Sequence, residues 1–243
     1  MKQLLTIIVG CDTAEKHAST LYDGIELIYP EENESEKDLI LRATKLSKGK
    51  YTILINETFR LADISSLLNM LDKNSPDMLV FAGGTAIKSS IVKAVAKDCQ
   101  DVFSCFILSV LDSKSVLKST YIPFIFDKNK VNFSEANYAG LLTSAERFVA
   151  LKAKLSKDVY SHALSALCAR LIIFYASAML DIRDGKMDSE VLASFDGKLK
   201  AEIVLYLAFE KNFTAANLTK LRKKGFKISW LTAKKFKKML NFQ

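Results

Sequence analysis

Four short apolar runs stand out in the first third of the chain. They span residues 4–9, 25–29, 51–55 and 78–82, are dominated by aliphatic side chains, and are bounded by polar or turn-forming residues. Continuous apolar runs of this length are typical of strands buried on both faces, as in a parallel sheet covered by helices. We therefore predict four buried β-strands in these positions.

Two stretches between these runs have the spacing of amphipathic helices. One carries its apolar residues at Leu39, Leu41, Ala43 and Leu46, and ends in the basic last turn and glycine stop of Lys48-Gly49. The other carries them at Ile64, Leu67, Leu68 and Leu71, before Asn74-Ser75-Pro76. Alternating strands and helices predict an α/β fold, a mostly parallel sheet with flanking helices and right-handed crossovers.

Three shorter segments complete the predicted α/β part. Residues 107–110 are predicted to form a further strand, and residues 113–118 a short helix after it. Gly83-Gly84-Thr85 follows a predicted strand and precedes a predicted helix over 86–96. We interpret it as a structural turn with Thr85 as the helix N-cap, in preference to a phosphate site, because the Gly-Lys-Ser/Thr ending of a P-loop is missing.

The pattern changes near residue 130. Residues 135–155, 158–183 and 188–211 have helical apolar spacing and no clear strand. We therefore predict two parts, an α/β domain over 1–130 and a helical extension over 131–243. Leu171–Leu180 is the longest apolar stretch, but it is about half the length that a membrane span requires, and we predict a core helix there.

Composition changes this picture little. The chain has 243 residues, of which 49% are hydrophobic and 26% charged, so it can bury a sizeable core. Its four cysteines and two histidines show no metal-ligand or CxxC spacing. We interpret the cysteines as small buried side chains and expect a cytoplasmic protein, with attachment to the inner face of the membrane as an additional hypothesis.

The net charge of +8 comes entirely from the C-terminal end. Residues 211–243 contain ten Lys or Arg and no Asp or Glu. Candidate membrane- or partner-binding residues are Trp230, Lys234, Lys235, Phe236, Lys237 and Lys238. This tail fits a docked terminal helix with a solvated lysine face, an anionic membrane surface, or an acidic partner protein or nucleic acid. Nucleic acid is less favoured, since no nucleic-acid motif accompanies the charge.

Residues 43–58 carry a more specific pattern, Ala-Thr-Lys-Leu-Ser-Lys-Gly-Lys-Tyr-Thr-Ile-Leu-Ile-Asn-Glu-Thr. It resembles the helix, Lys-Gly-x-Tyr turn and strand that deliver the Asp-x-Asp motif in family-two glycosyltransferases. The neighbouring strands and the segment Leu61–Leu71 follow the same order. The resemblance extends over about 130 residues, is specific over about 40, and implies a glycosyltransferase A-type, Rossmann-like fold that binds a nucleotide-diphospho-sugar.

The resemblance also shows where the usual chemistry is missing. The Asp-x-Asp carboxylates hold Mg²⁺ or Mn²⁺ in the family, and Asn56-Glu57-Thr58 stands in their place. Hard cations favour charged oxygen ligands, so a metal site here would rest on Glu57 with Asn56. No cofactor is therefore implied, except Mg²⁺ or Mn²⁺ if the protein is active.

Two other family positions give candidate site residues. The acidic residue that contacts the base corresponds to Glu31, which alternatively belongs to a solvated acidic loop. Where the family has Pro-x-Tyr-Asn, this chain has the non-matching Gly10-Cys11-Asp12-Thr13, and Gly10 and Asp12 complete the candidate nucleotide-binding set. The catalytic base corresponds to Ala136, which takes no proton; Glu135 is the substitute candidate, or a favourable charge in a first helical turn.

Two hypotheses follow from these residues. In the first, the chain is a glycosyltransferase-like protein in bacterial surface-glycan assembly, either a divergent sugar-nucleotide transferase or an inactive relative with a degenerate Asp-x-Asp. In the second, it is a non-enzymatic scaffold that associates with a membrane surface, a partner protein or nucleic acid through its basic tail. The missing carboxylates favour an inactive protein, so the enzyme assignment stays open.

Overall fold

The computed structural model describes residues 4–10, 24–55, 59–61, 64–81, 84–120, 124–126 and 135–183, with the single positions 185, 188, 190, 194 and 197. The chain divides into two compact units. The first comprises Met1–Asp127 and Leu151–Ala163, and the second comprises Lys128–Ala150 and Leu164–Gln243.

The first unit is built on a mostly parallel mixed sheet of six strands in the order β2-β1-β3-β6-β5-β7. The strands are β1 (Leu5–Val9), β2 (Ile25–Ile28), β3 (Tyr51–Ile55), β5 (Met78–Phe81), β6 (Gly84–Lys88) and β7 (Val116–Lys118). Strand β6 is antiparallel to both neighbours, and the other pairings are parallel. A separate antiparallel pair joins β4 (Phe59–Leu61) and β8 (Phe124–Phe126). The predicted α/β class is confirmed.

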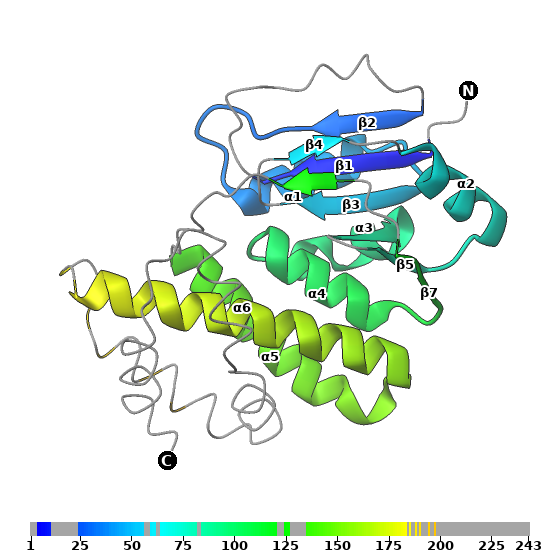
Figure 1. The fold of residues 1–243 in the computed structure, drawn as a ribbon. Coiled ribbons are helices and arrows are strands. Elements are labelled where there is room, and N and C mark those ends of the chain that lie inside the picture. Colours follow the sequence, from blue (N-terminus) through cyan, green and yellow to red (C-terminus); the bar gives the residue numbers. More distant parts are fainter. Residues whose placement is uncertain are drawn as a thin grey trace. The chain divides into compact units, whose positions relative to one another are not determined.

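Helices cover both faces of the six-stranded sheet (Figure 1). They are α1 (Glu36–Leu46), α2 (Ser65–Asn74), α3 (Ser89–Val95) and α4 (Val102–Asp112), with a short 3₁₀ turn, η2 (Ala96–Asp98). Leu67 and Leu71 of α2 pack with Ile7 and Ile53 in one apolar cluster. On the other face, the apolar residues of α1 pack with Ile8, Ile28 and Leu54. Alternate strand residues therefore point into two different cores. Both sets must be apolar, so the strands appear in the sequence as unbroken apolar runs.

The helices described beyond residue 130 are α5 (Glu135–Leu151), the 3₁₀ turn η3 (Lys152–Lys154) and α6 (Lys157–Arg183). The first residues of α6 belong to the first unit, and the remainder belongs to the second. Within the described residues, no helix is long and apolar enough to cross a membrane. The predicted helix over 188–211 falls almost wholly outside the described residues.

The four predicted strands and the two helices between them are confirmed, but three neighbouring assignments are wrong. Residues 107–110 lie inside helix α4, because Asp101 and Ser104 form a capping box and start a helix that is apolar on most faces. Residues 116–118 form strand β7, since the Asp77 carboxylate accepts hydrogen bonds from the amides of Lys114 and Ser115, both 3.1 Å away. These bonds draw the segment alongside β5.

The third wrong assignment concerns Gly83-Gly84-Thr85. Residues 84–88 form the antiparallel strand β6, and the helix begins only at Ser89. Gly84 pairs with Phe81, and a β-carbon at Gly84 would lie 2.6 Å from the Phe81 ring. The glycine is thus required for close packing of two strands and does not open a helix.

Gly49 joins the first three strands at their amino ends. The Thr6 hydroxyl donates to the Glu26 carboxylate at 2.9 Å and accepts from the Gly49 amide at 3.1 Å. The same Glu26 oxygen accepts from the Lys48 amide at 3.0 Å. The resulting chain of hydrogen bonds links β2, β1 and the residue pair that precedes β3.

The Lys-Gly-x-Tyr pattern therefore has a structural explanation in this chain. A β-carbon on Gly49 would lie 2.5 Å from the Thr6 nitrogen. The carbonyl of Gly49 accepts from Ser89 at 2.6 Å, and the fully buried Tyr51 donates its hydroxyl to the Pro76 carbonyl at 3.0 Å. Burial raises the pKa of Tyr51, so its hydroxyl stays protonated and available as a donor.

We predict that Gly49→Ala lowers the free energy of unfolding by about 1–3 kcal/mol. The added β-carbon would clash with backbone atoms, which cannot move aside without shifting β1. Gly197→Ala is the control, since a β-carbon there meets nothing within 4 Å in a helical, exposed position. The control should change stability by less than about 1 kcal/mol. Urea unfolding followed by circular dichroism measures both, and equal effects would contradict the close-packing account.

Candidate functional site

The carboxyl ends of β1, β2 and β3 lie at one edge of the sheet. Strands β1 and β2 run parallel, as do β1 and β3. The Gly10 amide, directly after β1, donates to the carbonyl of Ile55, the last residue of β3, at 2.8 Å. Gly10 therefore lies beside the point where the chain leaves β3 toward Asn56.

This edge contains a topological switch point. From β1 the chain goes to β2, on one side of the β1–β3 pair. The next strand of this sheet in the sequence after β3 is β5, which lies on the other side. Connections that leave adjacent parallel strands in opposite directions open a crevice outside their carboxyl ends, and α/β proteins bind ligands there. The crevice predicted by this rule is between β1 and β3, next to Gly10.

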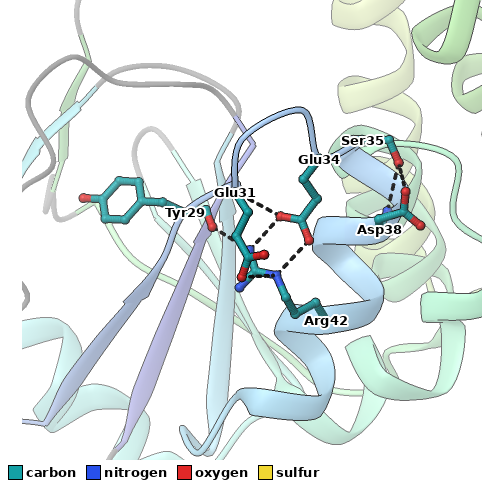
Figure 2. A network of polar contacts seen from close by, with 6 residues as sticks. All are labelled: Tyr29, Glu31, Glu34, Ser35, Asp38 and Arg42. Atoms are coloured by element: carbon teal, nitrogen blue, oxygen red, sulfur yellow. Dashed lines mark hydrogen bonds and ion pairs between the residues drawn. The ribbon is translucent and has the colours of Figure 1, made fainter.

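The segment after β2 is fixed by one arginine, as Figure 2 shows. The Arg42 guanidinium donates to both carboxylate oxygens of Glu34, at 2.7 and 2.6 Å. It also donates to the Tyr29 carbonyl at 2.8 Å. The Glu31 amide donates to the Glu34 carboxylate at 3.0 Å, and the Glu34 amide donates to the Glu31 carbonyl at 3.1 Å. We call these four residues the Arg42 clamp.

The charges of the clamp stabilise one another. The hydrogen bonds from Arg42 lower the pKa of Glu34, against the opposing effect of burial, and Glu34 in turn raises the pKa of Arg42. The Glu34 side chain is only 10% exposed, whereas the Glu31 side chain is 70% exposed and lies 3.4 Å from the Arg42 Nε. Glu34 is thus held by the protein, while most of the Glu31 side chain faces solvent.

The acidic residues of this loop consequently have different roles. Glu34 holds Arg42, and the Glu36 carboxylate accepts from the Val102 amide at 2.8 Å, at the start of α4. Glu31 and Glu32 are exposed. The interpretation of the loop as uniformly solvated therefore holds for two of its four glutamates, and Glu31 keeps a carboxylate that a ligand can reach.

The structure places only part of the predicted site. Gly10 and Glu31 lie at the carboxyl edge, after β1 and β2. Asp12, Asn56 and Glu57 lie outside the described residues, as do Trp230, Lys234, Lys235, Phe236, Lys237 and Lys238. Glu135 is the first residue of α5 in the second unit. Its predicted role as a base stays a prediction.

The described residues include three of the four cysteines and can be searched for a metal site. Among the described residues, no group of three or more His, Cys, Asp or Glu could hold a metal ion. Cys99, Cys105 and Cys168 are buried free thiols, as predicted, and burial raises the pKa of Cys168 to about 11. Cys11 lies outside the described residues.

Sequence reasoning missed Arg42 and Glu34. One signal was present, because Arg42 is the only arginine before residue 60 in a segment otherwise supplied with lysines. Arginine is favoured where a carboxylate must be held by two parallel hydrogen bonds. Which of the four nearby glutamates it would hold depends on the αL turn at Asn33, which the sequence pattern does not specify.

Comparison with known proteins adds no relative. No protein-family model, curated protein or solved structure matches the chain.

The Arg42 clamp gives a prediction with a defined pH dependence. Because the pKa of Glu34 is lowered from its ordinary 4.5, its stabilisation is complete above that pH and is lost as pH falls through the lowered value. Hydrogen exchange at the Glu31 amide should follow this loss. Glu34→Gln should reduce the protection of that amide at neutral pH by about tenfold, as expected for a hydrogen bond to a partly exposed charge.

Glu32→Gln is the matched control, since Glu32 is exposed in the same loop. It should leave the protection of the Glu31 amide unchanged. A Glu34→Gln variant with the same protection and the same pH profile as the unsubstituted protein would show that the clamp does not order this loop.

Proposed function

We propose that this chain is a glycosyltransferase-like protein that binds a nucleoside diphosphate at the carboxyl edge of β1, β2 and β3 and lacks the usual transfer chemistry. The observation that carries the proposal is the switch point beside Gly10. The segment with the family resemblance, residues 43–58, leads directly to this edge through β3.

The strand arrangement supports a glycosyltransferase A-type fold. The resemblance implies a mostly parallel sheet with flanking helices, and the six-stranded sheet with α1 to α4 has this arrangement. Strand β4 of the small antiparallel pair β4–β8 directly follows the Asp-x-Asp position, residues 56–58, in the sequence. The helical extension over 131–243 remains part of the proposal.

The Arg42 clamp supports a role for Glu31 in base recognition. A carboxylate accepts hydrogen bonds from base N–H groups, and it does so best when its backbone is held before the ligand arrives. Here the Glu31 amide and carbonyl are both hydrogen-bonded to Glu34, and its side chain is 70% exposed, with one carboxylate oxygen 3.4 Å from the Arg42 Nε. The backbone is thus fixed while the side chain stays available.

The donor set argues against full catalytic competence. Asn56, Glu57 and Thr58 supply one carboxylate and two neutral oxygen groups, where a divalent cation on a diphosphate is normally held by paired carboxylates. Ala136 stands at the position of the base and has no group that takes a proton. Any Mg²⁺ or Mn²⁺ would rest on Glu57, and transfer would need Glu135 to act as the base.

The alternative is a scaffold that binds an anionic membrane surface or an acidic partner through its tail. It is favoured by the concentration of ten cationic residues without an acid in residues 211–243. It requires no ligand at the sheet edge. The two functions are therefore separated by whether the first unit binds a nucleotide.

We predict that calorimetric titration of the full chain with UDP detects binding, and that Mn²⁺ changes the affinity little. Glu31→Gln should weaken binding by about tenfold or more, the loss expected for a hydrogen bond to a charged group. Glu32→Gln is the control, because Glu32 is exposed and adjacent to Glu31 in the same loop. This variant should bind UDP like the unsubstituted protein.

Two outcomes would overturn parts of this proposal. Binding that requires Mn²⁺ and disappears in Glu57→Gln would restore a working cation site and the enzyme hypothesis. An absence of UDP binding by the folded protein, with and without the metal, would contradict the nucleotide site and leave the scaffold function.

A further inference from the structure

His162 holds the first turns of α6 against the sheet within the first unit. Its Nε2 lies 3.1 Å from the hydroxyl of Thr85 on β6, and the Thr85 residue is buried. The Phe106 ring of α4 meets the imidazole edge-on, with ring centroids 5.9 Å apart and planes at 89°. Neighbouring Val159 and Ala163 on α6 are fully buried apolar anchors.

A second polar contact between this segment and the sheet, an ion pair, is weak by comparison. Lys118 on β7 pairs with Asp158 at 2.6 Å, but the two side chains are 61% and 59% exposed. Ion pairs at such exposure contribute little to stability. Of these two polar links between α6 and the sheet, the contact between His162 and Thr85 is thus the more buried.

Protonation of this imidazole is disfavoured by its surroundings. A neutral ring can either accept from the Thr85 hydroxyl or donate to it, so the hydrogen bond survives either tautomer. An imidazolium would be a charge half-buried beside the Phe106 ring. Of the nearby charged groups described, Lys118 repels it, and Asp158, one turn earlier on α6, is already paired with Lys118.

We propose that His162 is a pH-sensitive latch, which docks residues 157–163 of α6 on the sheet when neutral and releases them when protonated. The latch is independent of nucleotide binding. It makes acidification open a local part of the first unit while β1, β2 and β3 stay paired, since the two apolar clusters described around these strands do not include His162.

The direction of the effect follows from linkage. Burial, and secondarily Lys118, lower the pKa of His162 from its ordinary 6.5. The released segment therefore binds the proton more tightly than the docked segment, and docking is complete above 6.5 and weakens as pH falls below it. Between the released and docked pKa values, the opening equilibrium rises by about tenfold per pH unit.

The chain has two histidines, so a His17→Gln variant of the full chain carries one imidazole and reports on His162 directly. Its proton resonances, titrated by NMR from pH 8 to 5, should have a midpoint below 6.5. Protection of the Val159 and Tyr160 amides against hydrogen exchange should fall over the same range. Amides of α1 should keep their protection, which distinguishes local release from global unfolding.

Two substitutions separate charge from packing. His162→Gln keeps an amide that can bond Thr85 but has no titration, so protection of Val159 should no longer depend on pH between 8 and 5. Thr85→Val removes the hydroxyl and should lower that protection at pH 8. A His162 midpoint at or above 6.5, or amide protection that falls equally in His162→Gln, would overturn the latch.

Discussion

The close contact between Gly49 and the backbone of Thr6 is the constraint on which the sheet depends. It allows the chain to enter β3 directly beside β1, where the Tyr51 amide bonds to the Leu4 carbonyl at 3.0 Å. That starting point sets the parallel register from Leu5↔Tyr51 to Val9↔Ile55. A one-residue slip would turn every side chain of β3 to the opposite face and disrupt both cores.

The same register brings functional positions together at the opposite edge. Because β1 and β3 end in step, Gly10 lies beside Ile55 and the chain continues into Asn56-Glu57-Thr58. Strand β2 ends alongside, and the Arg42 clamp fixes the segment that bears Glu31. A packing requirement at the amino edge thus determines which groups can meet a ligand at the carboxyl edge.

Sequence reasoning predicted the fold where the pattern had one interpretation. The apolar runs of β1, β2, β3 and β5 were too short for helices and were bounded by turns, so they were assigned correctly. The run at 107–110 is compatible with a buried strand or a buried helix. It is helical because the capping box at Asp101 starts helix α4. Strand β6 was missed because Gly84 was interpreted as part of a turn that opens a helix. The structure requires a glycine there for another reason, since a β-carbon would clash with the Phe81 ring.

The candidate site was predictable in position and less so in detail. The family resemblance implied that Gly10 follows the first strand and Glu31 the second, and they follow β1 and β2, which pair in the sheet. The pairing of Arg42 with Glu34 through two hydrogen bonds, with Glu31 only a second partner at 3.4 Å, arises from the three-dimensional course of the loop. Such pairings depend on backbone conformation, about which residue spacing carries little information.

The central claim is that the carboxyl edge of β1, β2 and β3 binds a nucleoside diphosphate, and amide chemical-shift mapping with UDP tests it most directly. The account predicts that the largest shifts occur at Gly10, Glu31 and Ile55. Amides at the amino edge, such as Gly49 and Lys88, should stay unchanged. Shifts concentrated at the amino edge, or no shifts in a folded protein saturated with UDP, would contradict it.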